Sequence, residues 1–212
     1  MGIVSVLTLM CGNTAFAMEP QQTENQGDGI YVGTISVENG KTGEISEFPM
    51  TFLNANEQIQ MYSDDDSVTE TYKAIVEIDK EGNAKTVDYV PPVSRAEASA
   101  SDSNTYWKAS ISITYSVNNT TANLTKVSGS WTQLRGNTTL SDRYVYYRID
   151  GGNVGNSGEQ RPNTNTFSYN TGFSSISSNR LYSIGANSRA TVTTEAGLAL
   201  QLTTNVEKRY TS

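Results

Sequence analysis

Histidine is absent from this chain of 212 residues, and cysteine occurs only at Cys11. A chain without histidine has no Ser-His-Asp or Cys-His catalytic system, no histidine-bearing zinc site, and no side chain that ordinarily titrates near neutral pH. A lone cysteine cannot form a disulfide within the chain. The sequence therefore excludes the commonest catalytic systems and predicts a fold stabilised by burial without disulfides.

Recognisable catalytic motifs are missing as well. The sequence contains no Ser-x-x-Lys, no Asp-Thr-Gly or Asp-Ser-Gly, and no Gly-x-x-x-x-Gly-Lys phosphate loop. A glycosidase-like carboxylate pair needs two acids that face one cleft, and no such pair stands out in the sequence. We therefore predict that the protein is not an enzyme, with no catalytic residues and no cofactor.

Two stretches could suggest a calcium site. Ser63–Asp66 holds three adjacent carboxylates, but neighbouring side chains point in different directions and the stretch has no turn glycine. Asp150–Glu159 is rich in glycine, which predicts a mobile loop rather than a set of converging oxygen ligands. We predict no metal-binding residues.

Long hydrophobic runs are absent too, and the one short run lies at the N-terminus. Ile3–Met10 is too short for a transmembrane helix and is followed by Ala15-Phe16-Ala17, the small-x-small pattern of signal-peptide cleavage. This pattern predicts a signal peptide over residues 1–17, a mature chain starting near Met18, and an exported bacterial protein. The alternative is a lipoprotein with Cys11 as the acceptor.

What the sequence does contain is typical of β-strands. Ala109–Asn118 alternates apolar and hydroxyl side chains, and no long stretch has apolar residues at helical spacing. We therefore predict an all-β protein. This strand could line a soluble core, cross a membrane or present a sheet to a ligand. The next predicted strand along the chain has few large apolar residues, so the two strands together lack the continuous apolar band of a membrane hairpin, and lining the core is favoured.

Composition divides the chain into segments. Residues 18–28 are predicted to be a disordered acidic tail, residues 29–92 a small acidic region of β-hairpins, and residues 93–105 a polar linker. Two hairpins are expected in the second segment, one at Asn39-Gly40 and one near Gly82-Asn83.

Residues 106–212 are predicted to form an antiparallel β-sandwich of about seven strands. The candidate strands lie near residues 107–117, 122–132, 143–149, 165–171, 179–184, 188–194 and 198–207. Their number and the central Trp131 resemble immunoglobulin-like sandwiches in architecture only, since the cysteine pair of that fold is missing.

Charge changes sign between the two parts of the chain. Residues 18–105 carry 17 acidic and 5 basic residues, whereas residues 106–212 carry 5 acidic and 10 basic residues. Three explanations stay open: two unrelated solvated surfaces, an acidic N-terminal segment that covers a basic face until the linker is cut, or a basic face for an external polyanion.

Candidate binding residues lie in the segment Asp142–Asp150. Alternation directs Val145, Tyr147 and Ile149 to the core, and it directs Tyr144, Tyr146 and Arg148 to the opposite face. Either another layer covers these outer aromatic residues, or they form a platform for a sugar or a peptide.

The sequence as a whole predicts a secreted or cell-wall-associated bacterial protein that acts without catalysis, as a binding or structural module at the cell surface. The expected partner is a cell-wall polysaccharide or another anionic polymer, and neither nucleic acid nor an integral membrane segment is expected. The alternatives are a carbohydrate-active module and a pore-forming toxin precursor with an acidic N-terminal prosegment.

Overall fold

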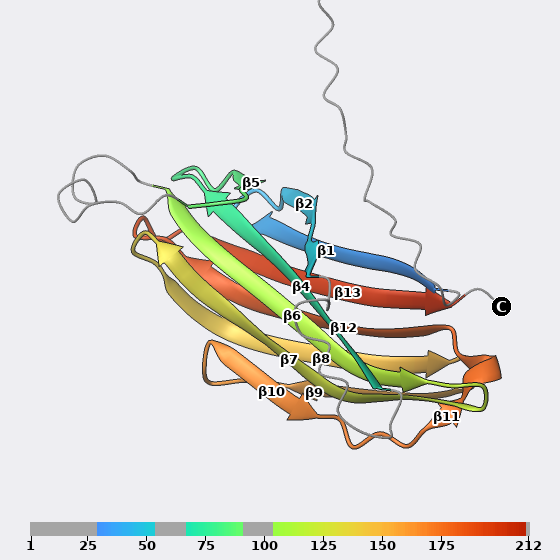
Figure 1. The fold of residues 1–212 in the computed structure, drawn as a ribbon. Helices are drawn as coiled ribbons and strands as arrows, with labels where there is room; N and C mark the ends of the chain where they lie inside the picture. Colours follow the sequence, from blue (N-terminus) through green and yellow to red (C-terminus); the bar gives the residue numbers. More distant parts are fainter. Residues whose placement is uncertain (1–28, 54–66, 91–103, 211–212) are drawn as a thin grey trace, which may run out of the picture.

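The computed structural model describes residues 29–53, 67–90 and 104–210. These residues form two antiparallel β-sheets that pack face to face, and Figure 1 shows the two layers. The all-β sandwich predicted from the sequence is confirmed, while the immunoglobulin-like strand order stays a prediction. The predicted signal peptide, the acidic tail, the stretch 63–66 and most of the predicted linker lie outside the described residues.

The first sheet, which we call sheet A, has six strands in the order β2-β1-β13-β12-β8-β9. Its strands are β1 (Gly29–Asn39), β2 (Ile45–Pro49), β8 (Thr139–Gly151), β9 (Val154–Gln160), β12 (Ser183–Thr193) and β13 (Ala199–Tyr210). The first and last described strands are therefore neighbours in the middle of this sheet, with Gly29 opposite Tyr210.

The second sheet, sheet B, follows the order β10-β7-β6-β4-β3, with β11 paired to β7 and β5 paired to β4. Its strands are β3 (Thr51–Leu53), β4 (Ser67–Ile78), β5 (Ala84–Thr86), β6 (Thr105–Val117), β7 (Thr121–Arg135), β10 (Thr166–Asn170) and β11 (Ile176–Ser177). A 3-10 turn, η2 (Ser178–Arg180), leads from β11 toward β12.

Strands from the two sequence ranges 29–92 and 106–212 pair with each other in both sheets. In sheet A, β1 pairs with β13 along its whole length, and in sheet B, β4 pairs with β6 from Ser67 to Ile78. The buried residues of both ranges belong to one hydrophobic cluster. The two ranges thus share both sheets and one core.

The longer strands agree with the sequence prediction except in two places, and the short strands β3 and β11 were not predicted. The predicted mobile loop over Asp150–Glu159 contains strand β9, an edge strand that pairs with β8. The two strands expected near 179–184 and 188–194 are one continuous strand, β12, because the chain stays extended and paired through Gly185. Both N-terminal hairpins are confirmed, as β1–β2 and β4–β5.

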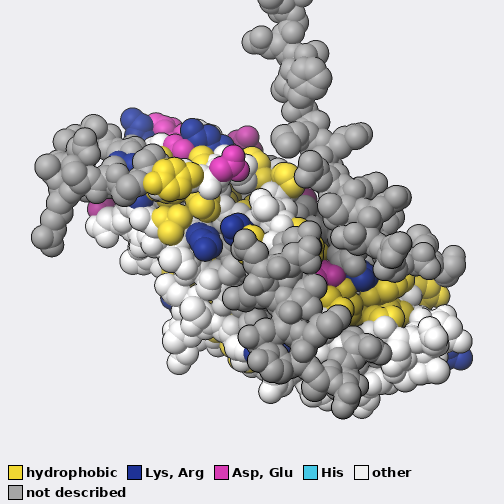
Figure 2. All heavy atoms as spheres, in the orientation of Figure 1, with side chains coloured by type: hydrophobic (Ala, Val, Ile, Leu, Met, Phe, Trp, Pro, Cys, Tyr) yellow, Lys and Arg dark blue, Asp and Glu magenta, His cyan; other side chains and the backbone are white. Residues whose placement is uncertain are grey.

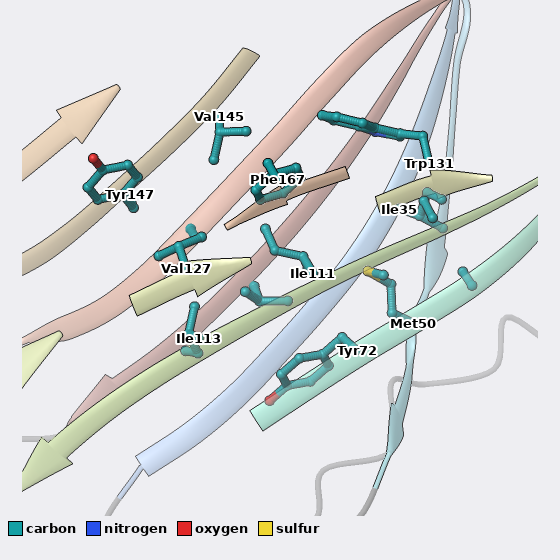
Figure 3. Packing of buried hydrophobic residues seen from close by; sticks show 14 of the residues in the cluster. Ile35, Met50, Tyr72, Ile111, Ile113, Val127, Trp131, Val145, Tyr147 and Phe167 are labelled. Carbon is teal, nitrogen blue, oxygen red and sulfur yellow. The ribbon is translucent and has the colours of Figure 1, made fainter. Parts of the chain in front are cut away.

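The core lies between the sheets and follows from the alternation in each strand. From sheet A, Ile35, Val145 and Tyr147 face inward, and from sheet B, Ile111 and Val127 meet them. Figure 3 shows these side chains with the buried Trp131 and Phe167, whose ring centroids lie 5.2 Å apart. Burial of such apolar surface is the main source of stability for a sandwich without disulfides.

A polar cluster interrupts this core and connects the two sheets. The ammonium of Lys208 in β13 donates a hydrogen bond to the Tyr115 hydroxyl at 2.9 Å, and Tyr115 donates to the Glu70 carboxylate. The Tyr72 hydroxyl also donates to Glu70, at 3.2 Å. Glu70 and Lys208 are 4% and 8% exposed, so both side chains lie in the interior, where these hydrogen bonds partly offset the cost of removing polar groups from water.

Within residues 29–53, 67–90 and 104–210, no helix is long and apolar enough to cross a membrane.

Candidate binding surface

The two outer faces of the sandwich carry different side chains. On sheet B, the outer side chains of the central strand β6 include Ser110, Ser112, Thr114 and Ser116, and β4 and β7 present further hydroxyls beside them. Figure 2 shows this side of the molecule, where most of the surface that is not grey is neither hydrophobic nor charged. The alternation of Ala109–Asn118 therefore separates a core face from a hydroxyl face.

Hydroxyls on this face pair with each other across the strands. Thr71 lies 2.8 Å from Ser112, and Ser110 lies 2.9 Å from Ser130. These paired hydroxyls carry neither a ring nor a charge. The same face also carries Lys73, Lys108 and Lys126, and the guanidinium carbon of Arg135 lies 5.8 Å from the centroid of the Tyr106 ring.

Sheet A places the three sequence-predicted site residues together. Tyr144, Tyr146 and Arg148 are half-buried on the outer face of β8, while Val145 and the other two inward residues of the strand are buried. The N-terminal strands β1 and β2 extend sheet A at one side rather than forming a layer over it. Among the described strands, β1 and β2 therefore extend sheet A and do not form the covering layer that was one of the two alternatives for these residues.

The ring of Tyr144 lies between two arginines from neighbouring segments. Arg189, opposite Tyr144 on β12, has its guanidinium carbon 4.7 Å from the ring centroid. Arg161, just after β9, has its guanidinium carbon 5.4 Å from the same centroid. These distances are typical of cation–π contacts, which hold the guanidinium groups beside the ring.

The Tyr144 hydroxyl donates a hydrogen bond of 2.7 Å to the carboxylate of Glu159 on β9. This hydrogen bond, together with burial and the negative charge of Glu159, raises the pKa of the Tyr144 phenol, and Arg189 and Arg161 oppose the rise only in part. The phenol thus stays protonated at neutral pH and keeps Glu159 in place as its acceptor.

Neither of the two arginines beside Tyr144 forms an ion pair with a carboxylate of the described residues. Among the described residues, no carboxylate oxygen lies within 4.0 Å of a side-chain nitrogen of Arg161 or Arg189. Both side chains are exposed. Each guanidinium therefore has free N–H donors in the planar arrangement that suits carboxylate and phosphate oxygens.

A second group of arginines lies further along the same face. Arg148 on β8 and Arg209 on β13 each contact the carboxylate of Glu207, at 2.7 and 2.8 Å. Burial raises the pKa of Glu207, but hydrogen bonds from Arg148, Arg209 and Ser183 outweigh burial and lower the pKa overall. Glu207 is therefore ionised and holds both guanidinium groups.

Gly185 makes this second group possible. Gly185 on β12 lies opposite both Arg148 and Glu207, so the arginine reaches across a strand that has no side chain at this point. A Cβ atom at position 185 would lie 2.7 Å from the Val206 carbonyl oxygen, which is too close without a shift of the strand. Only glycine fits this position without such a shift.

The outer face of sheet A therefore joins two arginine groups with tyrosines between them, and we call this set the arginine face: Tyr144, Tyr146, Arg148, Glu159, Arg161, Gly185, Arg189, Glu207 and Arg209. Such a face can bind an anionic ligand and donate hydrogen bonds to it. Within the described ranges, no three histidine, cysteine, aspartate or glutamate side chains are grouped to hold a metal ion.

Sequence reasoning found one strand of the arginine face and missed the others. Arg189 was detectable in principle, because it alternates with the buried Ser188 and Ala190. Arg161 and Glu207 gave no comparable signal, since their relation to β8 depends on strand pairing between distant segments. The isolated Gly185 within a strand pattern was the one local sign of a close approach.

Comparisons with known proteins give no further information about this surface: no family model matches the chain, and no curated protein or solved structure shows significant similarity to it.

Proposed function

We propose that this protein is an exported, non-enzymatic binding protein that holds an anionic extracellular polymer on the arginine face of sheet A. The observation that carries the proposal is the position of Tyr144 between Arg161 and Arg189, two exposed guanidinium groups with no carboxylate within 4.0 Å among the described residues.

The location of positive charge supports an anionic ligand. The chain has a net charge of −7, so a positive surface must be local rather than general. The arginine face provides one, because Arg161 and Arg189 lack close acidic partners while Arg148 and Arg209 share a single carboxylate. A local positive surface on an acidic protein favours a specific anion over unspecific attraction.

The chemistry of arginine narrows the ligand class. A guanidinium group offers several N–H donors in one plane and matches the oxygens of phosphate or carboxylate groups. Two guanidinium groups already lie over the Tyr144 ring, which leaves less room for stacked bases. We therefore favour a phosphate- or carboxylate-bearing polysaccharide over nucleic acid, in agreement with the export expected from residues 1–17.

Binding of the full mature chain to poly(glycerol phosphate), uncharged dextran and single-stranded DNA tests the proposal by calorimetry. We expect binding to the first polymer only, and a loss of about tenfold or more in affinity for Arg161→Gln with Arg189→Gln, because charge-assisted hydrogen bonds are lost. The matched control is Lys73→Gln with Lys126→Gln on sheet B, which removes the same charge and should leave the affinity unchanged.

Equal losses in the two double variants would show that only net charge matters and would contradict a site on the arginine face. Tighter binding to DNA than to poly(glycerol phosphate) would show that the ligand class is nucleic acid and would contradict the polysaccharide proposed here. Thermal unfolding of each variant checks that the substitutions have not disturbed the sandwich.

A further inference from the structure

The two arginine groups of sheet A are separated along the strand direction. Tyr144 and Arg148 are four residues apart on β8, and their partners on β12 are Arg189 and Gly185. At about 3.4 Å per residue in an antiparallel strand, four residues span about 14 Å. A single phosphate group cannot reach both positions.

The second group keeps donors for a ligand although its charges are partly used. Arg148 contacts Glu207 through one Nη nitrogen, and Arg209 contacts it through Nε. Each guanidinium has five N–H donors, so several stay available on both side chains. Their side chains are 43% and 65% exposed, so an incoming anion has access to them.

The carboxylates near the two arginine groups differ in number. Glu207 contacts both Arg148 and Arg209, and Asp150, two residues after Arg148 on the same face, is a second carboxylate near Arg148, so the second group offers spare N–H donors rather than excess charge. At the other end, Arg161 and Arg189 face the single carboxylate of Glu159, which is engaged by the Tyr144 hydroxyl. The first end thus has more guanidinium groups than carboxylates, and the stretch between the two ends carries Tyr146, with Asn187 opposite it on β12 and Glu159 opposite it on β9.

We infer that the arginine face binds its polymer at two points, with β8 as the track between them, and that its ligand is a linear polymer with anionic groups in successive repeat units. The inference rests on the proposed function. Two anions of one chain would contact the two arginine groups, and the uncharged part of the repeat would lie over Tyr146 and Asn187. Linking two weak contacts in one ligand raises the affinity without any new contact, provided that the ligand spans the distance.

Ligand length tests this inference. Inorganic phosphate, a glycerol phosphate dimer and a glycerol phosphate decamer are compared on the full mature chain at constant salt. We expect the affinity per phosphate group to rise by about tenfold or more from the dimer to the decamer, because only the longer ligand reaches both groups. The increase should weaken as added salt screens the charges.

Two single variants separate the two points. Arg209→Gln leaves Glu207 paired with Arg148 and removes one of the two guanidinium groups of the second group, so it should lower the affinity for the decamer more than that for inorganic phosphate, which still binds near Tyr144. Arg189→Gln should lower both affinities. Arg135→Gln on sheet B removes the same charge from the other side and should change neither.

The outcomes separate this inference from the proposed function. If no anionic ligand binds the unmodified chain, the proposed function fails and the inference fails with it. If the ligands bind with equal affinity per phosphate and Arg209→Gln has no effect, the single site near Tyr144 stands and the two-point track is overturned. A loss of decamer binding in Arg135→Gln equal to that in Arg209→Gln would overturn the track as well.

Discussion

The outer face of sheet B and the arginine face of sheet A belong to strands of similar length and the same alternation, yet they use their polar side chains differently. On sheet B, short hydroxyls such as Thr71 and Ser112 pair with each other at 2.8 Å. On sheet A, long side chains reach across strands, as Arg148 does over Gly185 to Glu207. Paired short groups satisfy one another, whereas arginines with spare donors stay available for a partner.

Alternation along a strand predicts which residues point outward, but it does not predict which side chains of neighbouring strands they contact. Both faces would be described as polar from the sequence. Only the register between strands shows that Tyr144 and Arg189 are neighbours, and that the hydroxyls of β6 face hydroxyls of β4 and β7.

The largest effect, on cooperative unfolding, is expected from a deletion that tests whether the two faces belong to one folding unit. Deletion of residues 18–92 removes β1 and β2 from sheet A and β3, β4 and β5 from sheet B, together with buried residues such as Ile35 and Val76. We expect residues 106–212 alone to lack a cooperative thermal transition, because β6 and β13 would become unpaired edges beside an open core. Calorimetry of the fragment and of the full chain measures this.

The control is the full chain cut between residues 93 and 103 with both pieces retained, which should still unfold cooperatively. A fragment that unfolded cooperatively at nearly the temperature of the full chain would instead show two folding units, as the composition of residues 93–105 predicts.

The next effect contrasts the two sides of β8. Tyr147→Ala should cost about 3 to 5 kcal/mol of unfolding free energy, because a large buried ring leaves a cavity. Tyr144→Ala, on the arginine face, should cost about 1 kcal/mol or less, as expected for a half-buried surface position. Urea denaturation of both variants gives the two values. Similar losses of unfolding free energy would mean that the Tyr144 ring stabilises the fold as much as the buried Tyr147 ring does, and would contradict a binding role for the outer side of β8.

A smaller effect comes from pH, because the arginine face depends on a carboxylate and the hydroxyl face does not. The pKa of Glu207 is lowered in the folded protein, so its stabilising contribution is complete above the ordinary glutamate value of about 4.3 and is lost as the pH falls through the lowered value. Unfolding free energies measured from pH 6 down to pH 2.5 should therefore decrease in this window.

Glu207→Gln should reduce that acid dependence, while Ser112→Ala on sheet B should leave it as in the unmodified chain. The pKa of Asp79, in the β4–β5 turn, is also lowered, because hydrogen bonds from Asn83, Glu81 and Gly82 outweigh its burial. Some acid dependence therefore persists in Glu207→Gln. An unchanged profile in that variant would contradict the role given to the Arg148–Glu207–Arg209 group.

The smallest effect is expected on the hydroxyl face. Thr71→Val and Ser112→Ala each remove one partner of a half-buried hydroxyl pair, and the partner that remains can bind water. Each variant should cost about 1 kcal/mol or less, the usual net contribution of a neutral hydrogen bond. A double-mutant cycle gives the pair energy, and a value of several kcal/mol would mean that the two faces differ less than their chemistry implies.

Much of the fold could be predicted because the relevant signals are local. The alternation in residues 109–118 and 144–149 correctly assigned inner and outer side chains to β6 and β8. Strand β9 was missed because its glycines weaken any strand signal, although Gly158 has a clear role. A Cβ atom there would lie 2.6 Å from the buried ring of Tyr147. Tertiary packing requires the residue that local propensity disfavours.

The candidate site could be predicted only in part. Tyr144, Tyr146 and Arg148 share one strand, so alternation places them on one face. Arg161 and Arg189 meet Tyr144 through pairings of β8 with β9 and β12, and Glu207 meets Arg148 from two strands away. Such long-range register leaves no pattern within one segment of sequence, which is why most residues of the site could not be predicted.

The pairing of β1 with β13 also affects how the protein is made. A ribosome releases the chain from its N-terminus, at about 5 to 20 residues per second. Strand β1 therefore emerges first and waits on the order of ten seconds for its partner, the last strand of the described chain. Sheet A cannot be completed until synthesis is nearly over, since β13 lies between β1 and β12. The fold thus leaves β1 without its partner strand for most of the time that the chain is being synthesised.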